Sequence, residues 1–268
     1  MTTKLSFIIV TWNTAEITKK CVETINKYIP HQEIIIVDNG SQDNTISLLS
    51  KYKNVKIIEN NANLGFSKAN NIGLKSATSD YIIFMNSDIE LLDANILNMV
   101  DFLKNNSDIG IIGPKFLNPD LTSQGSVFPP QTALNAFKEF WLNKPNSFSK
   151  YVPKNQNPIP VSYISGGCLA VNKHFFESIG GWNEKYYFYF EDMDLCRKVN
   201  QIGKQVYFYP DCQIIHRHGA SGKNLAPQKD QWRRLIPSSK KFHGIFKHYL
   251  INFIIWSGQK WQKLIHSK

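Results

Sequence analysis

The chain contains 268 residues, of which 42% are hydrophobic and 19% are charged, and its formal net charge is +10. This length is enough for one large α/β domain or two small ones, and the composition argues against a disordered chain. The four cysteines have no C-x-x-C spacing, which argues against a zinc site or a disulfide framework and favours reduced thiols in a cytosolic protein.

Two observations concern membranes. The N-terminal apolar segment, residues 5–10, is too short for a signal peptide, and Trp12-Asn13 interrupts it. No apolar run reaches the ~18 residues that a membrane-spanning helix needs. We therefore expect the chain to stay on the cytoplasmic side of any membrane. Its positive charge favours polyanionic partners, namely nucleic acid, anionic lipid or phosphorylated ligands.

The N-terminal part of the chain alternates short apolar runs with helical patterns. We expect strands over residues 5–10, 33–37, 55–58 and 81–85, and helices over residues 16–28, 43–52 and 67–76. Because each strand is almost uniformly apolar, the pattern predicts a mostly parallel α/β sheet with helices on both faces. Ligands bind beyond the carboxyl ends of such strands. The polar residues expected along that edge are Asn13, Asp38, Asn39, Asn63 and Asp88.

The second part of the chain is less regular. Prolines after Pro114 predict a loop-rich region that extends to residue 160. Regular structure is expected to resume over residues 161–171, with helices near 173–179 and 191–201. No repeat or low-complexity linker is present. The simplest organisation is a single domain over residues 1–222 with a basic, helical C-terminal appendage over residues 223–268.

The first chemical motif is Asn86-Ser87-Asp88, which ends the fourth apolar run. In an extended chain Asn86 and Asp88 point to the same side. A carboxylate at this place suits a hard divalent cation that neutralises the β-phosphate of a departing sugar diphosphate. The alternative is a polar turn in which Asp88 caps the next helix.

The second motif begins at Glu191-Asp192, where a helix is expected to start. Helical spacing puts Leu195, Val199 and Ile202 on one core-facing stripe. Asp192 lies on that stripe and Glu191 at its edge. A carboxylate aligned with a core face needs a partner or a function, and a general base beside a sugar hydroxyl is one such function. The alternative is that these acids only complement the helix dipole.

Two further motifs are weaker signals. His216 and His218 follow an apolar run and precede Gly219, which suits a metal ligand and a phosphate contact but equally a basic turn. The asparagine-rich loop that contains Gly65 allows close approach of the backbone to a ligand, with a helix directing its amides at a phosphate. The same loop would also serve as a simple helix cap.

Taken together, these motifs resemble glycosyltransferase family 2, most of all the branch with bacterial rhamnosyltransferases, over roughly residues 4–222. The segments that carry the resemblance are Thr11-Trp12-Asn13, Val37-Asp38-Asn39-Gly40-Ser41, Asn63-Leu64-Gly65-Phe66, Asn86-Ser87-Asp88, Ser165-Gly166-Gly167, Gly180-Gly181-Trp182-Asn183-Glu184, Glu191-Asp192-Met193-Asp194-Leu195 and His216 to Ser221. Two segments depart from the family pattern. Asn86 stands where the D-x-D element has a carboxylate, and Trp182-Asn183-Glu184 stands where Phe-Asp-Glu is common.

The resemblance implies a GT-A fold, inversion at the anomeric carbon and a divalent cation, Mg²⁺ or Mn²⁺. It implies Asp192 as the catalytic base and Asp88 and His216 as metal ligands, with His218 as a secondary candidate. The nucleotide-binding residues that it implies are Thr11, Asn13, Asp38, Asn39, Asn63, Gly65 and Ser87. The acceptor-side residues that it implies are Gly166, Gly167, Trp182 and Glu191.

The expected activity follows from this resemblance. A sugar, with rhamnose as one candidate, moves from a dTDP- or UDP-linked donor to a hydroxyl of a glycan or lipid-linked acceptor in cell-surface polysaccharide synthesis. Other classes fit less well. A dinucleotide oxidoreductase needs G-x-G-x-x-G after the first strand, and a sugar-nucleotide pyrophosphorylase a glycine-rich loop with a basic residue there. A nucleic-acid-binding module fits the charge but lacks a recognition motif, so no nucleic-acid partner is expected.

The C-terminal segment interleaves basic residues with tryptophan and isoleucine. Tyr249, Phe253, Trp256, Lys260 and Lys263 support an amphipathic helix. Two interpretations remain open at this point. The segment forms a helical pair that packs on the domain, or it attaches the protein peripherally to the inner face of the plasma membrane, where a lipid-linked acceptor would lie.

Overall fold

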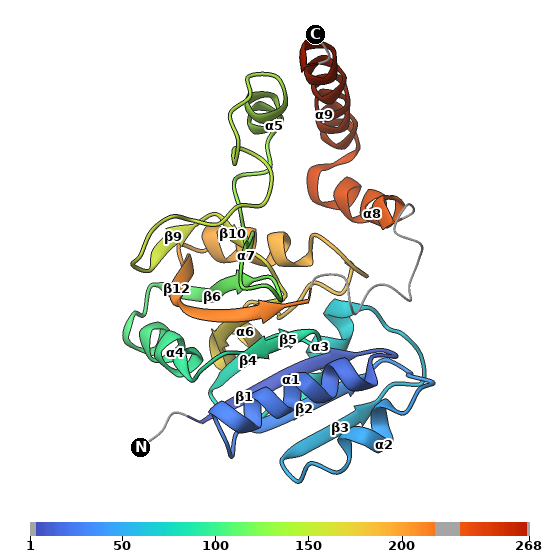
Figure 1. The fold of residues 1–268 in the computed structure, drawn as a ribbon, viewed down its shortest axis with the longest axis vertical. Helices are drawn as coiled ribbons and strands as arrows, with labels where there is room; N and C mark the ends of the chain where they lie inside the picture. Colours follow the sequence, from blue (N-terminus) through green and yellow to red (C-terminus); the bar gives the residue numbers. More distant parts are fainter. Residues whose placement is uncertain (1–3, 218–230, 267–268) are drawn as a thin grey trace.

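The computed structural model describes residues 4–217 and 231–266 of the protein (Figure 1). The expected boundary between residues 222 and 223 falls outside the described residues, as does His218.

The N-terminal half of the central sheet consists of four parallel strands, as the sequence predicts. β1 pairs with β2 and with β4, and β2 pairs with β3. Helix α2 is shorter than predicted: it begins at Thr45, whose amide donates a hydrogen bond to the Asp43 side chain, and it ends at Leu49. The elements are β1 (Leu5–Thr11), α1 (Ala15–Tyr28), β2 (Glu33–Asp38), α2 (Thr45–Leu49), β3 (Val55–Glu59), α3 (Phe66–Ser76) and β4 (Tyr81–Asn86).

The rest of the sheet is mixed, which corrects the expectation of a mostly parallel sheet. The strand order is β3-β2-β1-β4-β11-β6-β12-β5, and β11 runs antiparallel to both β4 and β6. The chain enters β11 at the carboxyl edge of β4, where the Asn86 amide donates to the Gly167 carbonyl, so it must run back along β4. The elements are β5 (Ile89–Leu91), α4 (Asn95–Asn105), β6 (Ile109–Leu117), β7 (Ser123–Gln124), β8 (Val127–Phe128), α5 (Ala133–Phe140), β9 (Ile159–Val161), β10 (Tyr163–Ile164), β11 (Cys168–Asn172), α6 (Lys173–Ser178), α7 (Glu191–Gln201) and β12 (Gln205–His216).

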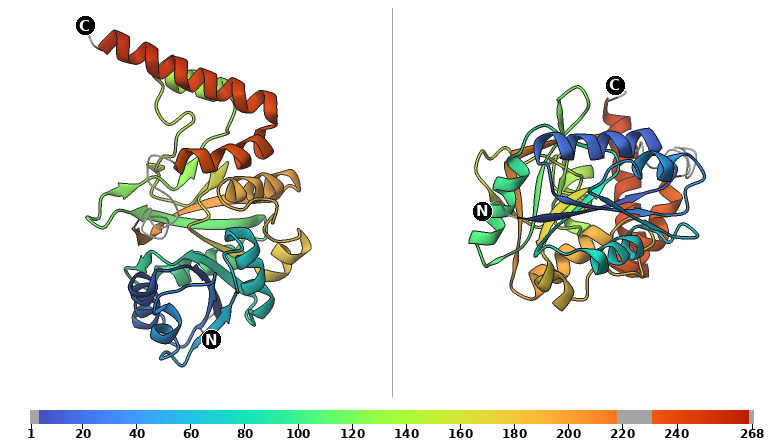
Figure 2. Two further views of the ribbon diagram at one scale, coloured as in Figure 1. Left: turned by 90° about the vertical axis from the view of Figure 1, so that its right-hand side faces the viewer. Right: turned by 90° about the horizontal axis from the view of Figure 1, so that it is seen from below.

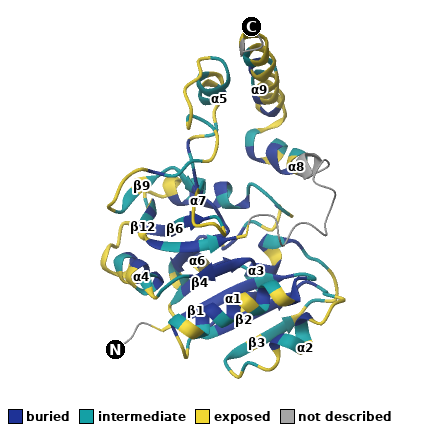
Figure 3. Ribbon diagram, viewed as in Figure 1, coloured by how far each residue is buried: buried dark blue, intermediate teal, exposed yellow. Residues whose placement is uncertain are grey.

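Helices cover both faces of the sheet, as predicted (Figure 2). Residues from α1 and α4, such as Ile25 and Met99, pack with Phe7 on one face. Residues from α3, α6 and α7 pack with Ile8 on the other, where Phe176 is fully buried. Most residues of β1, β2 and β4 are buried between these layers, whereas β3 at the edge of the sheet is only partly buried (Figure 3). The four cysteines are also buried, and none of them forms a disulfide.

The C-terminal segment consists of α8 (Gln231–His243) and α9 (Ile245–His266). Gly244, with a φ of +79°, separates them. Helix α8 packs on the body of the protein, where Arg197 of α7 donates a hydrogen bond to the Phe242 carbonyl (3.0 Å) and its guanidinium lies 4.2 Å from the centroid of the Phe242 ring.

Helix α9 leaves the body and runs beside α5 (Figures 1 and 2). Trp141 Nε1 donates to the Ile254 carbonyl (3.2 Å), and Gln262 Nε2 donates to the Phe140 carbonyl (2.9 Å). We call α5 and α9 together the helical arm. Among the helices that the structure describes, none is long and apolar enough to cross a membrane.

Candidate active site

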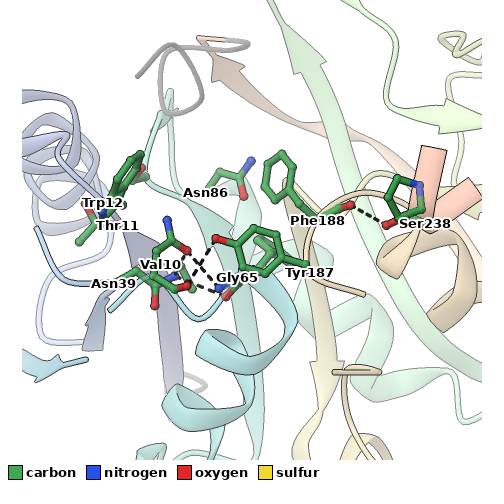
Figure 4. Close-up of a pocket in the computed structure, with 13 residues that line it drawn as sticks. Val10, Thr11, Trp12, Asn39, Gly65, Asn86, Tyr187, Phe188 and Ser238 are labelled. Atoms are coloured by element: carbon green, nitrogen blue, oxygen red, sulfur yellow. Dashed lines mark hydrogen bonds between the residues drawn. The ribbon is translucent and has the colours of Figure 1, made fainter. Parts of the chain in front are cut away.

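A pocket opens at the carboxyl edge of the parallel strands (Figure 4). Its volume of about 360 Å³ falls within the range of small-molecule sites. Thr11 and Trp12 line it from one side, and Tyr187 and Phe188 line it from the other. Five of the seven residues expected to bind a nucleotide line this pocket, namely Thr11, Asn39, Asn63, Gly65 and Ser87.

The other two residues expected to bind the nucleotide, Asn13 and Asp38, do not line the pocket. Their side chains accept hydrogen bonds from backbone amides of residues 40–42. Asp38 Oδ2 accepts hydrogen bonds from the amides of Gly40 (3.1 Å) and Ser41 (2.8 Å). Asp38 is 1% exposed, and its Oδ1 has no hydrogen-bond partner within the described part of the chain. Asn13 Oδ1 accepts a hydrogen bond from the Gln42 amide (2.7 Å).

Gly65 determines how closely the two walls of the pocket approach. It adopts φ +83° and ψ 174°, a conformation that is nearly restricted to glycine. A Cβ atom built on Gly65 would lie 2.6 Å from the Tyr187 carbonyl oxygen and 2.7 Å from its ring. The next amide, of Phe66, donates a hydrogen bond to that carbonyl (3.0 Å). Glycine at this position therefore lets the loop before α3 contact the aromatic segment of residues 186–190.

We expect Gly65→Ala to lower the free energy of unfolding by about 1–3 kcal/mol and to weaken nucleotide binding, because it combines backbone strain with a clash at Tyr187. Thermal denaturation and calorimetric titration with nucleoside diphosphates measure both effects. Gly203→Ala is the matched control, since Gly203 also has a positive φ (+78°) but no atom within 4 Å of a built Cβ. Equal effects of the two substitutions on nucleotide binding would contradict the prediction.

A second cavity continues from the first. The two share Phe66, Asn86 and Phe188. The second cavity brings together most of the residues expected for the metal, the base and the acceptor, namely Asp88, Gly166, Gly167, Glu191, Asp192 and His216.

Asp88 and His216 meet because β12 pairs with β5 in a register that sets His216 opposite Ile89. His216 Nε2 lies 3.5 Å from Asp88 Oδ1, and both side chains are buried. The Gln124 amide nitrogen donates to the His216 carbonyl (3.0 Å) and to Asn118 Oδ1 (2.8 Å). Its Oε1 therefore faces His216 Nδ1 (2.6 Å), so Nδ1 is the ring nitrogen that contacts Gln124.

Nε2 of His216 faces a carboxylate oxygen of Asp88, and an imidazole nitrogen beside a carboxylate oxygen is a pair that fits a divalent cation. Within the described ranges no group of three or more His, Cys, Asp or Glu side chains is placed to hold a metal. Two protein ligands are enough for Mg²⁺ where substrate phosphates and water complete the coordination. Asn86, the last residue of β4, also lines the cavity, but Ser87 and Asp88 form a turn rather than the extended chain expected.

Asp192 lies at the start of α7 with both carboxylate oxygens directed at backbone amides. Oδ2 accepts from Gly166 (3.0 Å) and Oδ1 accepts from Met193 (2.8 Å). Burial raises the pKa of Asp192, and the Gly166 amide opposes this shift most strongly. Burial, together with the charge of Asp192, raises the pKa of the neighbouring Glu191 well above its usual value. The two adjacent carboxyls therefore favour a state in which Asp192 is ionised and Glu191 is protonated.

Two sequence-based placements need correction. Trp182 does not line either cavity, because it is 1% exposed and its ring packs edge-on against Phe66 and Phe84 behind Gly166. Ile202 does not share the core face of α7, because it is 52% exposed at the end of that helix.

The structure also adds residues that the motifs did not indicate. Pro237 and Ser238 of α8 line the first cavity, and the Ser238 hydroxyl donates to the Phe188 carbonyl (2.9 Å). Lys150, from the loop-rich region after α5, lines the second. Lys150 lies in a proline-rich segment without a periodic pattern, and Pro237 and Ser238 lie on α8, which meets the pocket only through tertiary packing.

Comparison with known proteins shows what the whole chain resembles. The N-acetylglucosaminyl-diphospho-decaprenol L-rhamnosyltransferase of Mycobacterium tuberculosis is 26% identical over 211 residues, which cover 70% of this chain and 67% of that protein. A crystal structure of GalNAc-T7 with UDP, GalNAc and Mn²⁺ superposes with a TM-score of 0.63 at 18% identity, over 80% of this chain and 44% of that one. This chain therefore spans less than half of GalNAc-T7.

The mannosyltransferase PcManGT from Pyrobaculum calidifontis, in complex with GDP-Man and Mn²⁺, gives a TM-score of 0.60 at 16% identity, over 92% of this chain and 63% of that one. These likenesses confirm the GT-A fold. A family model described as the N-terminal domain of galactosyltransferase matches residues 146–218. The model of glycosyl transferase family 2 matches residues 6–180. The chain belongs to glycosyltransferase family 2.

Proposed function

We propose that the protein transfers a sugar, with inversion, from a nucleoside-diphosphate donor in the first cavity to an acceptor hydroxyl in the second. The observation that carries the proposal is the junction between the cavities. Phe66, Asn86 and Phe188 line both, so a sugar at the junction is reached from the donor side and from the acceptor side. Asp88 and Asp192 line the acceptor-side cavity next to this junction.

The reaction then needs one proton transfer and one displacement. The acceptor hydroxyl gives its proton to Asp192 while its oxygen bonds to the anomeric carbon, and the bond from that carbon to the diphosphate oxygen breaks. The amides of Gly166 and Met193 hold the carboxylate in place for this role. A divalent cation held by Asp88 and His216 would neutralise the charge that develops on the leaving diphosphate. The hydroxyls of Thr11, Thr14 and Ser87 form a connected chain at the donor side.

The donor that we propose is a dTDP- or UDP-linked sugar, with rhamnose as the first candidate, and the acceptor is a glycan or lipid-linked glycan of a cell-surface polysaccharide. The name of the mycobacterial relative, a rhamnosyltransferase that acts on a diphospho-decaprenol, supports both choices. A panel of nucleotide sugars, assayed with Mg²⁺ or Mn²⁺ for release of nucleoside diphosphate, tests the proposal. Turnover of a nucleoside triphosphate with a sugar phosphate, detected as pyrophosphate, would instead identify a pyrophosphorylase.

We further propose that the helical arm holds the protein on the inner face of the plasma membrane. One face of α9 packs on α5, where Ile251 is 4% exposed and a Cβ on Gly258 would lie 2.6 Å from the Phe140 carbonyl oxygen. The opposite face carries exposed aromatic side chains at helical spacing, with Phe253 60% and Trp256 58% exposed.

The positive charge of α9 supports an anionic membrane as the partner of the face that carries Phe253 and Trp256. The helix contains no acidic residue, and Lys247, Lys260 and Lys263 are exposed. Long basic side chains beside aromatic rings are typical of helices that lie in the interface of anionic bilayers. An acceptor attached to a lipid would then reach the catalytic cavities from the membrane on which the enzyme sits.

Replacing Phe253 and Trp256 together by serine is expected to lower binding to vesicles that contain anionic lipid by at least about 100-fold, because each large side chain contributes roughly 1.5–3 kcal/mol when it leaves water. Co-sedimentation with phosphatidylglycerol vesicles measures the effect. Ile202→Ser, at an exposed apolar residue outside the arm, is the matched control. Unchanged vesicle binding by the double variant, with loss of a wild-type dimer in size-exclusion chromatography, would show that a second copy of the chain covers this face instead.

A further inference from the structure

Lys150 brings a positive charge into the acceptor-side cavity from a segment with no catalytic motif. It lies in the loop after α5, directly before Tyr151, which forms an isolated β-bridge with Val127. Its ammonium lies 4.8 Å from the centroid of the Phe128 ring and 3.5 Å from Ser165 Oγ. The residue as a whole is exposed, but its ammonium lies beside Phe128 and Ser165, which line the same cavity as Asp192.

Most titratable groups near Asp192 are acidic, so the positive charge of Lys150 is unusual in this cavity. Glu191 adjoins Asp192 on α7, and the Cys196 thiol lies one turn further along the helix. Asp88, in the turn after β4, and His216, at the end of β12, line the same cavity. Asp194 is engaged elsewhere, with Arg197 and Asn183. Of the residues that the structure describes, Lys150 is the only lysine or arginine that lines this cavity.

We propose that Lys150 is a positioning residue for the reaction, whose ammonium group keeps the carboxylate of Asp192 ionised and oriented to accept the proton of the acceptor hydroxyl. The inference rests on the proposed function, since it assigns a purpose to the charge state of the proposed base. Lys150 does not itself touch the reacting atoms in this assignment.

The electrostatics of the cavity support the proposal. Burial raises the pKa of Asp192 and so favours its protonated form, which would be inactive as a base. The amides of Gly166 and Met193 and the ammonium of Lys150 lower the pKa of Asp192 against the effect of burial. Burial in turn lowers the pKa of Lys150, and the charge of Asp192 opposes that shift. Each group therefore stabilises the charged form of the other.

The test is the pH dependence of kcat/KM in Lys150→Met and Lys150→Arg, compared with the wild type and with Lys154→Met, an exposed lysine of the same segment. In the wild type, kcat/KM falls as the pH falls through the pKa of Asp192. An opposite charge nearby lowers the pKa of a carboxyl by about 1–3 units. Lys150→Met should therefore shift the pH at which kcat/KM falls, the acid limb of the pH profile, to a value about one unit or more higher. Lys150→Arg should restore the wild-type limb, and Lys154→Met should not shift it.

The possible outcomes separate this inference from the function on which it rests. If the wild type turns over no nucleotide sugar, the proposed function fails. If it does, and Lys150→Met keeps the wild-type acid limb, the role of Lys150 is overturned. An increase in the KM for the acceptor without a shift of the limb would also overturn it, and would indicate that Lys150 binds an anionic group of the acceptor. Nucleotide affinity and the melting temperature, measured on each variant, show whether a loss of activity comes from misfolding.

Discussion

Replacing Asp192 by asparagine is expected to lower kcat/KM for sugar transfer by about 10²–10⁴, the usual contribution of a positioned general base. An amide of the same size cannot accept the proton of the acceptor hydroxyl. It also presents an NH₂ group to one of the two amides, of Gly166 or Met193, that now donate to carboxylate oxygens. The measurement is the rate of nucleoside diphosphate release with donor and acceptor both present.

Two controls make this result interpretable. Affinity for the nucleotide should change little, because Asp192 does not line the first cavity. The thermal melting curve shows whether the new donor contact destabilises α7. Near-normal turnover by a folded Asp192→Asn variant would rule out Asp192 as the base.

Asp88→Asn is expected to lower kcat/KM by about 10²–10³, an effect of the size seen when one preorganised electrostatic contact to a developing charge is removed. Asp88 is the only carboxylate of the Asn86-Ser87-Asp88 motif, so its loss leaves His216 as the single expected protein ligand from this cavity. The affinity for Mn²⁺ in the presence of a nucleoside diphosphate, measured by electron paramagnetic resonance, should fall with the rate.

The matched control is Glu90→Gln, two residues further along the chain. Glu90 pairs with Arg217 and does not line either cavity, so its replacement should leave Mn²⁺ affinity unchanged. If Asp88→Asn binds Mn²⁺ as tightly as the wild type, the cation site is not where we propose it.

Much of the donor side could be predicted from local pattern. Uniformly apolar strands that alternate with helices predict parallel pairing, and parallel strands end at one edge. The structure accordingly gathers Thr11, Asn39 and Asn63 around one pocket. The acceptor side was less predictable. Trp182, which its motif suggested as an acceptor contact, is a core residue, because an aromatic side chain near a glycine turn fits a core as well as a binding wall.

The sequence by itself therefore determined the family, the parallel half of the sheet, and the polar edge that carries Asp88. Only the tertiary structure decided that β11 inserts antiparallel beside β4, that the pairing of β12 with β5 sets His216 against Asp88, and that Lys150, from a proline-rich segment, lines the same cavity as Asp192. It also decided that α8 lines the donor pocket and that α9 runs beside α5. Periodicity reports which face of an element is buried, whereas these contacts join residues far apart in the chain, and their geometry depends on strand register and loop paths that no local pattern encodes.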